Sequence, residues 1–252
     1  MADVAGVHAK LGRAEEHLRA FDELYTEFVL SQPYTIFTEF DPETGWHIVR
    51  WHVLREPPLE ELGLIFGDMI SNLRATLDYL VWQLVLAAGR RPGKRTGFPV
   101  VRREKDWEVQ SRAALHGVDP RWVAEIEYLQ PYRRVERPSL HPLAILDHVN
   151  NLNKHRFLPV AMLSVERLDL LINVREAPGE AIESHDSLDR PITQGGEAAR
   201  FRVPSKALLD VVVNQSPRTR LNFDDGLDYE WHPPDLLVWV KEAVALFEPA
   251  FR

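Results

Sequence analysis

Polar residues recur along the most apolar helix that the sequence predicts, over residues 59–88. Arg74 and Asp78 are four residues apart, so they share a helix face and can form an ion pair, and Asp68 and Asn72 have the same spacing. A buried helix must satisfy each polar group it carries. These polar residues therefore predict either a hydrogen-bond network that holds this helix to its neighbours or a binding site. In a binding site, the arginine would favour a ligand with phosphate or carboxylate groups.

A second polar set lies on the helix predicted over residues 141–156. Its members fall within ten residues: Asp147, His148, Asn151, Lys154, His155 and Arg156. His148, Asn151 and His155 share one face, so the two imidazoles could act as acid and base or bind a metal. Alternatively, the basic residues complement the dipole at a helix end. A shared site requires that this helix and the helix over 59–88 meet in space.

The middle of the chain is basic although the whole chain has a net charge of −8. Residues 1–89 hold 6 Lys/Arg and 14 Asp/Glu, whereas residues 90–156 hold 14 and 8. The densest basic stretch comprises Arg90, Arg91, Lys94, Arg95, Arg102, Arg103 and Lys105, and a second one comprises Arg133, Arg134 and Arg137. Such patches bind phosphate even in acidic proteins. The alternative is a solvated loop that pairs with the acidic N-terminal helix.

Several classes of chemistry are excluded by what the sequence lacks. There is no cysteine, which excludes disulfides, thiolate metal sites and a cysteine nucleophile. The nucleophile motif G-x-S-x-G and the nucleotide motifs G-x-G-x-x-G and the P-loop do not occur. The sequence predicts neither a resident metal nor a cofactor. Most of the seven tryptophans sit in apolar runs and are expected in the core.

The apolar pattern predicts an α+β fold. Its helices are expected over 4–30, 59–88, 104–115, 119–130, 141–156 and 234–251, and its first two strands over 34–41 and 46–54. Further short strands are expected after residue 158, with a long loop over 176–198. The result is a helical core around a long buried central helix, with a β-hairpin in the N-terminal half and a β-rich C-terminal segment closed by a helix.

These elements are expected to form a single compact unit, 1–252. Residues 1–157 make its mainly helical part, with the hairpin at 34–54, and residues 158–252 make its β-rich part with the C-terminal helix. No window of 18 apolar residues is free of charge, and the first residues lack the order of a signal peptide. A cytoplasmic protein with no membrane partner is therefore expected.

Three segments resemble a group of uncharacterised, mainly actinobacterial proteins: HAKLGRAEEHL, GDMISNLRATLDYLVWQL and NNLNKHRFLPV. The central segment also resembles the HEPN superfamily of helical nucleotide- and RNA-acting domains, whose signature is an Arg followed after four to six residues by a His. Asn72 and Arg74 match that helix, and Tyr79 stands five residues after Arg74 where a His would be expected.

The HEPN resemblance implies that Arg74 stabilises a phosphate in a homodimeric cleft. Because Tyr79 replaces the histidine, His148 or His155 would be the base and Lys154 a charge stabiliser, in metal-independent cleavage at a 2′-hydroxyl. The remaining candidates for substrate contacts are Asn72, Asp78, Asn151, Arg156, Arg102 and Arg103.

The sequence therefore predicts an RNA- or nucleotide-acting protein, in its most specific form a ribonuclease of a defence or toxin type, with RNA or a nucleotide as partner. Two alternatives stay open: a non-catalytic homodimeric binding or scaffold protein, and a small-molecule enzyme with a His/Asp acid–base or metal site.

Overall fold

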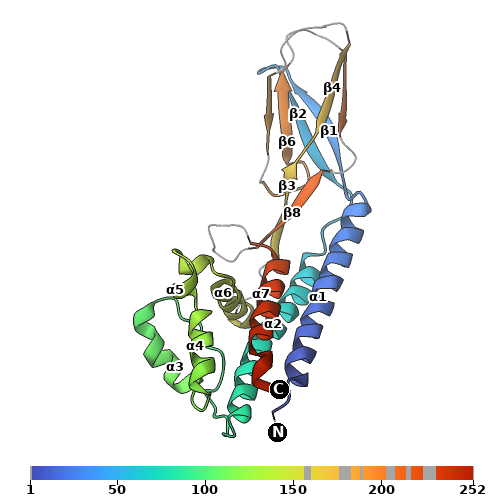
Figure 1. Cartoon of the computed structure of the whole chain (residues 1–252). Helices are drawn as coiled ribbons and strands as arrows, with labels where there is room; N and C mark the ends of the chain where they lie inside the picture. The colour runs from blue at the N-terminus through green and yellow to red at the C-terminus, as the bar shows by residue number, and fades with distance from the viewer. Residues whose placement is uncertain are drawn as a thin grey trace. The chain divides into compact units, whose positions relative to one another are not determined.

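The contacts within the chain divide it into two compact units. The computed structural model describes residues 2–155, 160–175, 183–187, 190–202, 208–213, 217–223 and 231–251 (Figure 1). The helical unit comprises Met1–Asp22, Gly63–Pro159 and Asp225–Arg252, and the β unit comprises Glu23–Leu62 and Val160–Asp224. The α+β class is confirmed. The expectation of a single compact unit stays a prediction.

The helices begin and end close to the positions that the sequence predicts. They are α1 (Ala5–Leu30), α2 (Leu59–Ala87), α3 (Trp107–Ala114), α4 (Pro120–Tyr128), α5 (Pro131–Arg134), α6 (Pro142–His155) and α7 (Pro233–Phe247). Short 3-10 helices are found at Glu104–Asp106, Pro138–Leu140 and Glu248–Phe251. Among the described residues, no helix combines the length and the apolar character that a membrane span requires.

Helix α2 is the buried centre of the helical unit, as the sequence predicts. Its fully buried side chains include Phe66, Met69, Ile70, Leu73, Leu77, Leu80, Val81, Leu84 and Val85. The helix ends at Gly89, which has a φ of +70°. The backbone N–H groups of Gly89 and Arg90 donate to the carbonyls of Leu86 and Val85, and this pairing satisfies the last turn. A side chain at residue 89 would be strained in this conformation.

The C-terminal helix α7 belongs to the helical unit. From the sequence we expected this helix to close the β-rich part. Its apolar face is buried along its length. Phe247 packs on Trp122 of α4 with ring centroids 5.6 Å apart, and Trp239 meets His141, just before α6, edge-on at 5.3 Å. This grouping rests on contacts between distant parts of the chain, which a local pattern does not contain.

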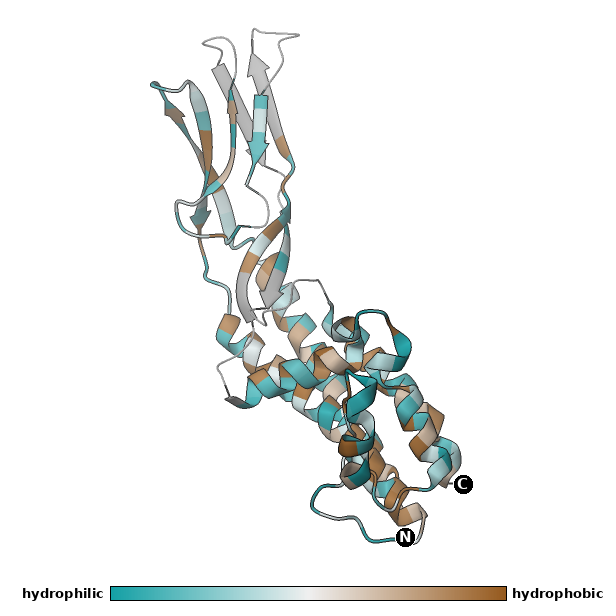
Figure 2. Ribbon diagram, turned by 90° about the vertical axis from the view of Figure 1, so that its left-hand side faces the viewer, coloured by the Kyte–Doolittle hydropathy of each residue, from teal (hydrophilic) through white to brown (hydrophobic). Residues whose placement is uncertain are grey.

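The β unit is built from antiparallel strands. They are β1 (Tyr34–Asp41), β2 (Trp46–Val53), β3 (Val160–Arg167), β4 (Leu170–Arg175), β5 (Glu183–Asp186), β6 (Glu197–Arg202), β7 (Leu208–Val213) and β8 (Arg218–Phe223). Four of them form a sheet in the order β1-β2-β6-β5, and β3 pairs with β8 and β4 with β7. Figure 2 shows both hydrophobic and hydrophilic residues along β1 and β2.

The predicted hairpin is confirmed and is closed by Asp41, whose carboxylate accepts hydrogen bonds from the Thr44 hydroxyl and the Glu43 N–H. These bonds lower the pKa of Asp41. Strand β2 also pairs with β6, so the hairpin belongs to the β unit rather than to the mainly helical part. The prediction of a continuous loop over 176–198 is wrong at β5, a short and wholly polar edge strand that hydrophobic alternation could not reveal.

The core of the β unit lies between its sheets. Val49, Trp51 and Phe201 from the four-stranded sheet are buried in one cluster with Val165 of β3 and Leu168, which follows β3. Tyr25 of α1 donates a hydrogen bond to the carbonyl of Thr219 in β8. This core therefore depends on residues from both ends of the sequence.

Candidate functional site

The two polar helices predicted to carry chemistry meet in the helical unit. The Asn153 amide on α6 donates to the Gly67 carbonyl at 3.1 Å and to the Ser71 hydroxyl at 3.3 Å, both on α2. A β-carbon at residue 67 would lie 2.5 Å from the Asn153 Oδ1 atom, so the helices approach closely because this residue is glycine. Some of the polar side chains on these helices therefore hold the two helices together.

Arg74 and Asp78 act as a clamp on the backbone of Phe98. Arg74 Nη2 donates to the Phe98 carbonyl at 2.7 Å and lies 3.1 Å from Asp78 Oδ1, which accepts the Phe98 N–H at 2.9 Å. The predicted ion pair is therefore present. Arg74 Nη1 is also buried, and the described residues offer it no hydrogen-bond partner. The predicted contacts of both side chains with a substrate stay predictions.

The other predicted substrate residues are spread over the helical unit. Arg102 donates to the carbonyl of Ala144 on α6 and lies 3.9 Å from the Asp147 carboxylate. Arg103 pairs with Asp106 at 2.7 Å. Asn72 accepts a hydrogen bond from the Lys10 ammonium of α1 at 3.4 Å. Arg102 is thus close to the polar face of α6, whereas Arg103 is neutralised locally.

The end of α6 carries the predicted acid–base residues. His148 is half-buried, and Asn151 and Lys154 are exposed. The side chain of His155 and the whole of Arg156 lie outside the described residues, so the predicted pairing of two imidazoles stays a prediction. Within the described part of the chain, no cluster of three His, Asp or Glu side chains could hold a metal ion.

An exposed basic loop follows α2. We use this name for residues 90–95, whose cations Arg90, Arg91, Lys94 and Arg95 are all exposed. For these four side chains the structure describes neither an ion pair nor a hydrogen bond. The loop is ordered by a turn in which the Gly93 N–H donates to the Thr96 hydroxyl at 2.9 Å and the Thr96 N–H donates to the Gly93 carbonyl at 3.1 Å.

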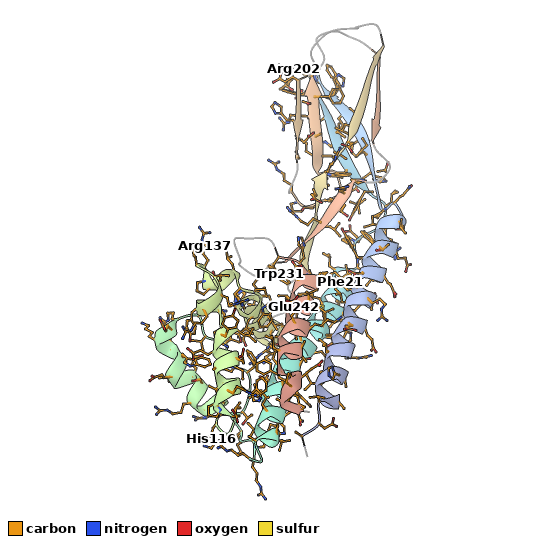
Figure 3. All side chains as sticks on the ribbon, in the orientation of Figure 1. Phe21, His116, Arg137, Arg202, Trp231 and Glu242 are labelled. Carbon is orange, nitrogen blue, oxygen red and sulfur yellow. The ribbon has the colours of Figure 1, made fainter. Side chains whose placement is uncertain are left out.

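Both ends of the basic loop are anchored. The first end is fixed by the Gly89 helix cap, and the second by the clamp on Phe98 and by a hydrogen bond from the Gly97 N–H to the Ala114 carbonyl. A β-carbon at Gly117 would lie 3.5 Å from the β-carbon of Arg90, so the 115–119 turn packs beside the loop. Figure 3 labels His116 at this end of the helical unit. Arg74 and Asp78 therefore act as positioning residues for the basic loop.

The second basic cluster, at 133–137, differs from the basic loop because its charge is partly neutralised. Arg133 donates to the Glu127 carboxylate, and this bond lowers the pKa of Glu127. The guanidinium of Arg134 lies over the ring of Tyr128, 4.5 Å from its centroid. The basic loop is thus the more accessible of the two clusters for an anionic partner.

Exposed aromatic side chains on α2 were missed by the sequence prediction. Trp51, Trp107 and Trp122 are buried as expected, but Trp82 is 44% exposed and Tyr79 is 45% exposed. The spacing of these residues could have indicated their exposure. Residues 75, 79, 82 and 86 share one face of the helix, and the most strongly apolar residues lie on the other faces. The apolar runs around Trp82 obscured that face.

Comparisons with known proteins do not assign a function to this site. No family model, no curated protein and no solved structure matches the chain. The resemblances described above stay predictions.

Proposed function

We propose that this protein binds RNA through the basic loop of its helical unit. The observation that carries the proposal is that Arg90, Arg91, Lys94 and Arg95 are exposed together and that none of them has a carboxylate partner among the residues that the structure describes. Several arginines elsewhere on the surface are paired, for example Arg13 with Glu16, Arg103 with Asp106, Arg167 with Asp169 and Arg200 with Glu197. Unpaired cations held in one ordered loop favour an anionic partner.

Nucleic acid is the anion that fits this loop best. Four cations within six residues can each contact one phosphate of a chain whose charges are closely and regularly spaced, and release of counterions then drives binding. The guanidinium groups can also bind phosphate with two hydrogen bonds. The resemblance of the α2 segment to HEPN domains favours RNA over DNA.

Metal-independent cleavage is the more specific form of the proposal. His148 would take the proton of a 2′-hydroxyl and the exposed Lys154 would stabilise the charge on the phosphate. We expect cleavage of labelled RNA in the presence of EDTA by the wild type, and no cleavage but unchanged binding after His148→Ala. A variant of Arg74 is a poor probe of catalysis, because Arg74 also anchors the basic loop.

Binding is tested by the salt dependence of the affinity for a fluorescent 20-nucleotide RNA. Four phosphate contacts to a single strand predict a slope of about −2.8 in log K against log salt, or about a fiftyfold loss between 50 and 200 mM. We expect the variant with Arg90, Arg91, Lys94 and Arg95 changed to Gln to lose this salt-dependent binding.

The matched control removes the same number of charges from paired positions, as Arg13→Gln, Arg50→Gln, Arg167→Gln and Arg200→Gln. We expect the control to bind RNA as the wild type does. An equal loss of affinity in both variants would show that net charge alone matters, and wild-type affinity in the loop variant would refute the proposal.

A further inference from the structure

One exposed face of α2 carries a stripe of residues that leads to the basic loop. The stripe comprises Asn72, Ala75, Tyr79, Trp82 and Leu86, which follow one another at spacings of three and four and therefore lie above one another on the helix. Tyr79 and Trp82 are its exposed aromatic members, and the other three are half-buried. Over these 15 residues the stripe extends for about 21 Å along the helix axis.

The Tyr79 ring of the stripe lies beside the start of α1. A β-carbon at Gly6 would lie 3.5 Å from Cδ1 and 3.7 Å from Cε1 of the Tyr79 ring, so α1 supports this ring without covering it. The Gln83 side chain accepts the N–H of Asp3 at 2.8 Å and fixes the first residues of α1 beside α2. Tyr79 is therefore presented to solvent in a defined position, at little further cost in side-chain entropy when a ligand binds.

Cations lie at both ends of the stripe. At one end the Lys10 ammonium donates to Asn72, and at the other end Leu86 is followed after four residues by Arg90 of the basic loop. Two carboxylates on or beside this part of α2 are already engaged: Asp78 with Arg74 and the Phe98 N–H, and Asp3 with the N–H of Ala5. The stripe thus places two exposed aromatic rings on the face of α2 that precedes the basic loop, with Lys10 and the exposed Asp68 near its Asn72 end.

We propose that this aromatic stripe stacks the unpaired bases of RNA whose phosphates bind the basic loop. The proposal rests on the RNA-binding function proposed above and adds the class of RNA. Aromatic side chains next to a basic surface bind single strands, because every base has a face that can stack. A duplex keeps those faces inside its own stack, so the stripe selects single-stranded over double-stranded RNA.

The test compares the affinities of a 12-nucleotide single strand and its duplex for the wild type, Trp82→Ala and Tyr79→Ala. Loss of one stacked base costs about 1–3 kcal/mol, which corresponds to a 5- to 150-fold weaker affinity for the single strand. We expect the duplex affinity and the salt slope to stay unchanged, and Trp82→Phe to retain most of the affinity. Tyr128→Ala removes an exposed aromatic side chain elsewhere in the helical unit and is expected to have no effect.

The outcomes separate the two proposals. Failure of the wild type to bind any RNA would overturn both. Salt-dependent binding with equal affinities for single strand and duplex, unchanged by Trp82→Ala, would overturn base stacking and leave the basic loop as the binding site. Sedimentation of the same variants tests one more outcome. If the wild type is a dimer, and Trp82→Ala is a monomer with unchanged RNA affinity, the stripe is an interface between two copies of the chain and base stacking is overturned.

Discussion

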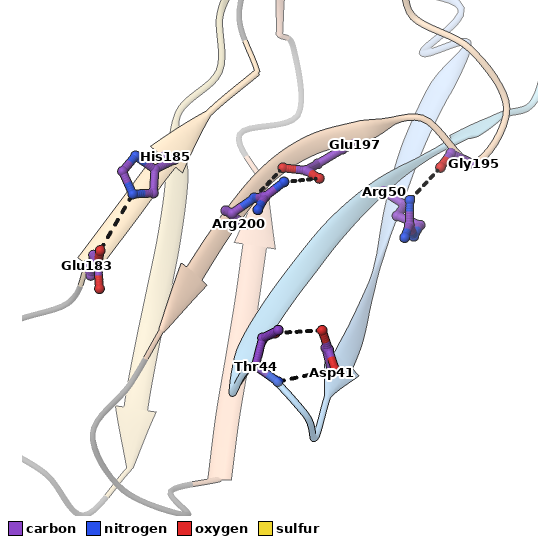
Figure 4. A network of polar contacts seen from close by, with 8 residues as sticks. All are labelled: Asp41, Thr44, Arg50, Glu183, His185, Gly195, Glu197 and Arg200. Atoms are coloured by element: carbon purple, nitrogen blue, oxygen red, sulfur yellow. Dashed lines mark hydrogen bonds and ion pairs between the residues drawn. The ribbon is translucent and has the colours of Figure 1, made fainter.

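The helical unit and the β unit use the same kinds of charged residue in different ways. In the helical unit, Arg74 has a side chain only 17% exposed and holds a loop from inside, while four cations of the basic loop have no described partner on the surface. In the β unit, the polar contacts lie on the surface of a sheet, where Arg200 pairs with Glu197 and His185 with Glu183 (Figure 4). The helical unit thus presents four exposed cations without a described partner in one loop, whereas on the sheet of the β unit Arg200 is neutralised by Glu197.

This difference also predicts where stability resides. A buried polar group that loses its partner costs about 1–3 kcal/mol, whereas an exposed ion pair contributes about 0–1 kcal/mol. Substitutions of buried polar residues in the helical unit should therefore cost more than substitutions of sheet-surface pairs, and three measurements test this comparison.

The largest effect is expected for Arg74→Met. The substitution removes the donor to the Phe98 carbonyl and the partner of Asp78, so we expect the free energy of unfolding to fall by about 2–3 kcal/mol in urea denaturation. RNA affinity should fall as well, because the basic loop loses its anchor. Arg13→Met, which breaks an exposed pair, is the control, and equal losses in the two variants would contradict the clamp.

A pH-dependent effect is expected for His141, which is buried just before α6. Its Nδ1 atom accepts the Leu143 N–H at 3.2 Å, and burial, together with the charge of Arg134, lowers its pKa to about 4. The unfolded chain binds this proton near pH 6.5, so the contribution of His141 is complete above pH 6.5 and is lost as the pH falls towards 4.

The matched variant is His141→Asn, which keeps an acceptor at the helix N-cap but does not titrate. We expect the difference in free energy of unfolding between wild type and variant to change between pH 7 and pH 4.5, with the wild type losing more. Parallel pH profiles for the two proteins would show that the imidazole has the same pKa in the folded and the unfolded chain, and would contradict the burial argument.

The smallest effect is expected for Arg200→Met in the β unit. Arg200 makes two hydrogen bonds to Glu197, at 2.7 and 2.8 Å, on the sheet surface. We expect the free energy of unfolding to fall by much less than in Arg74→Met, and the loss to shrink further in 1 M NaCl. A loss as large as that of Arg74→Met would remove the distinction between the two units.

Much of the fold could be predicted from the sequence because its signals are local. The apolar run over 59–88 predicted the buried central helix, and the apolar pattern over 34–41 and 46–54 predicted the two strands of the hairpin. Strand β5 carried no such signal, since Glu183–Asp186 is polar on both faces. The pairing of β2 with β6 joins segments about 150 residues apart, and local periodicity has no information on such contacts.

The candidate site was predictable only in part. The density of positive charge after residue 89 is a property of composition, so the sequence by itself determined the basic loop. Which cations stay unpaired depends on the carboxylates that the fold brings near them, and Arg103, in the same stretch, turned out to be paired. Trp82 likewise changed from an expected core residue to an exposed one once the neighbours of α2 were known.

The sequence by itself thus determined the α+β class, the central helix and the basic segment, because each follows from local periodicity or composition. Only the tertiary structure decided that α2 and α6 meet at Gly67 and Asn153, that Arg74 and Asp78 clamp Phe98, and that an aromatic stripe leads to the basic loop. The physical reason is that burial and pairing are properties of neighbours in space, and these neighbours come from distant parts of the chain.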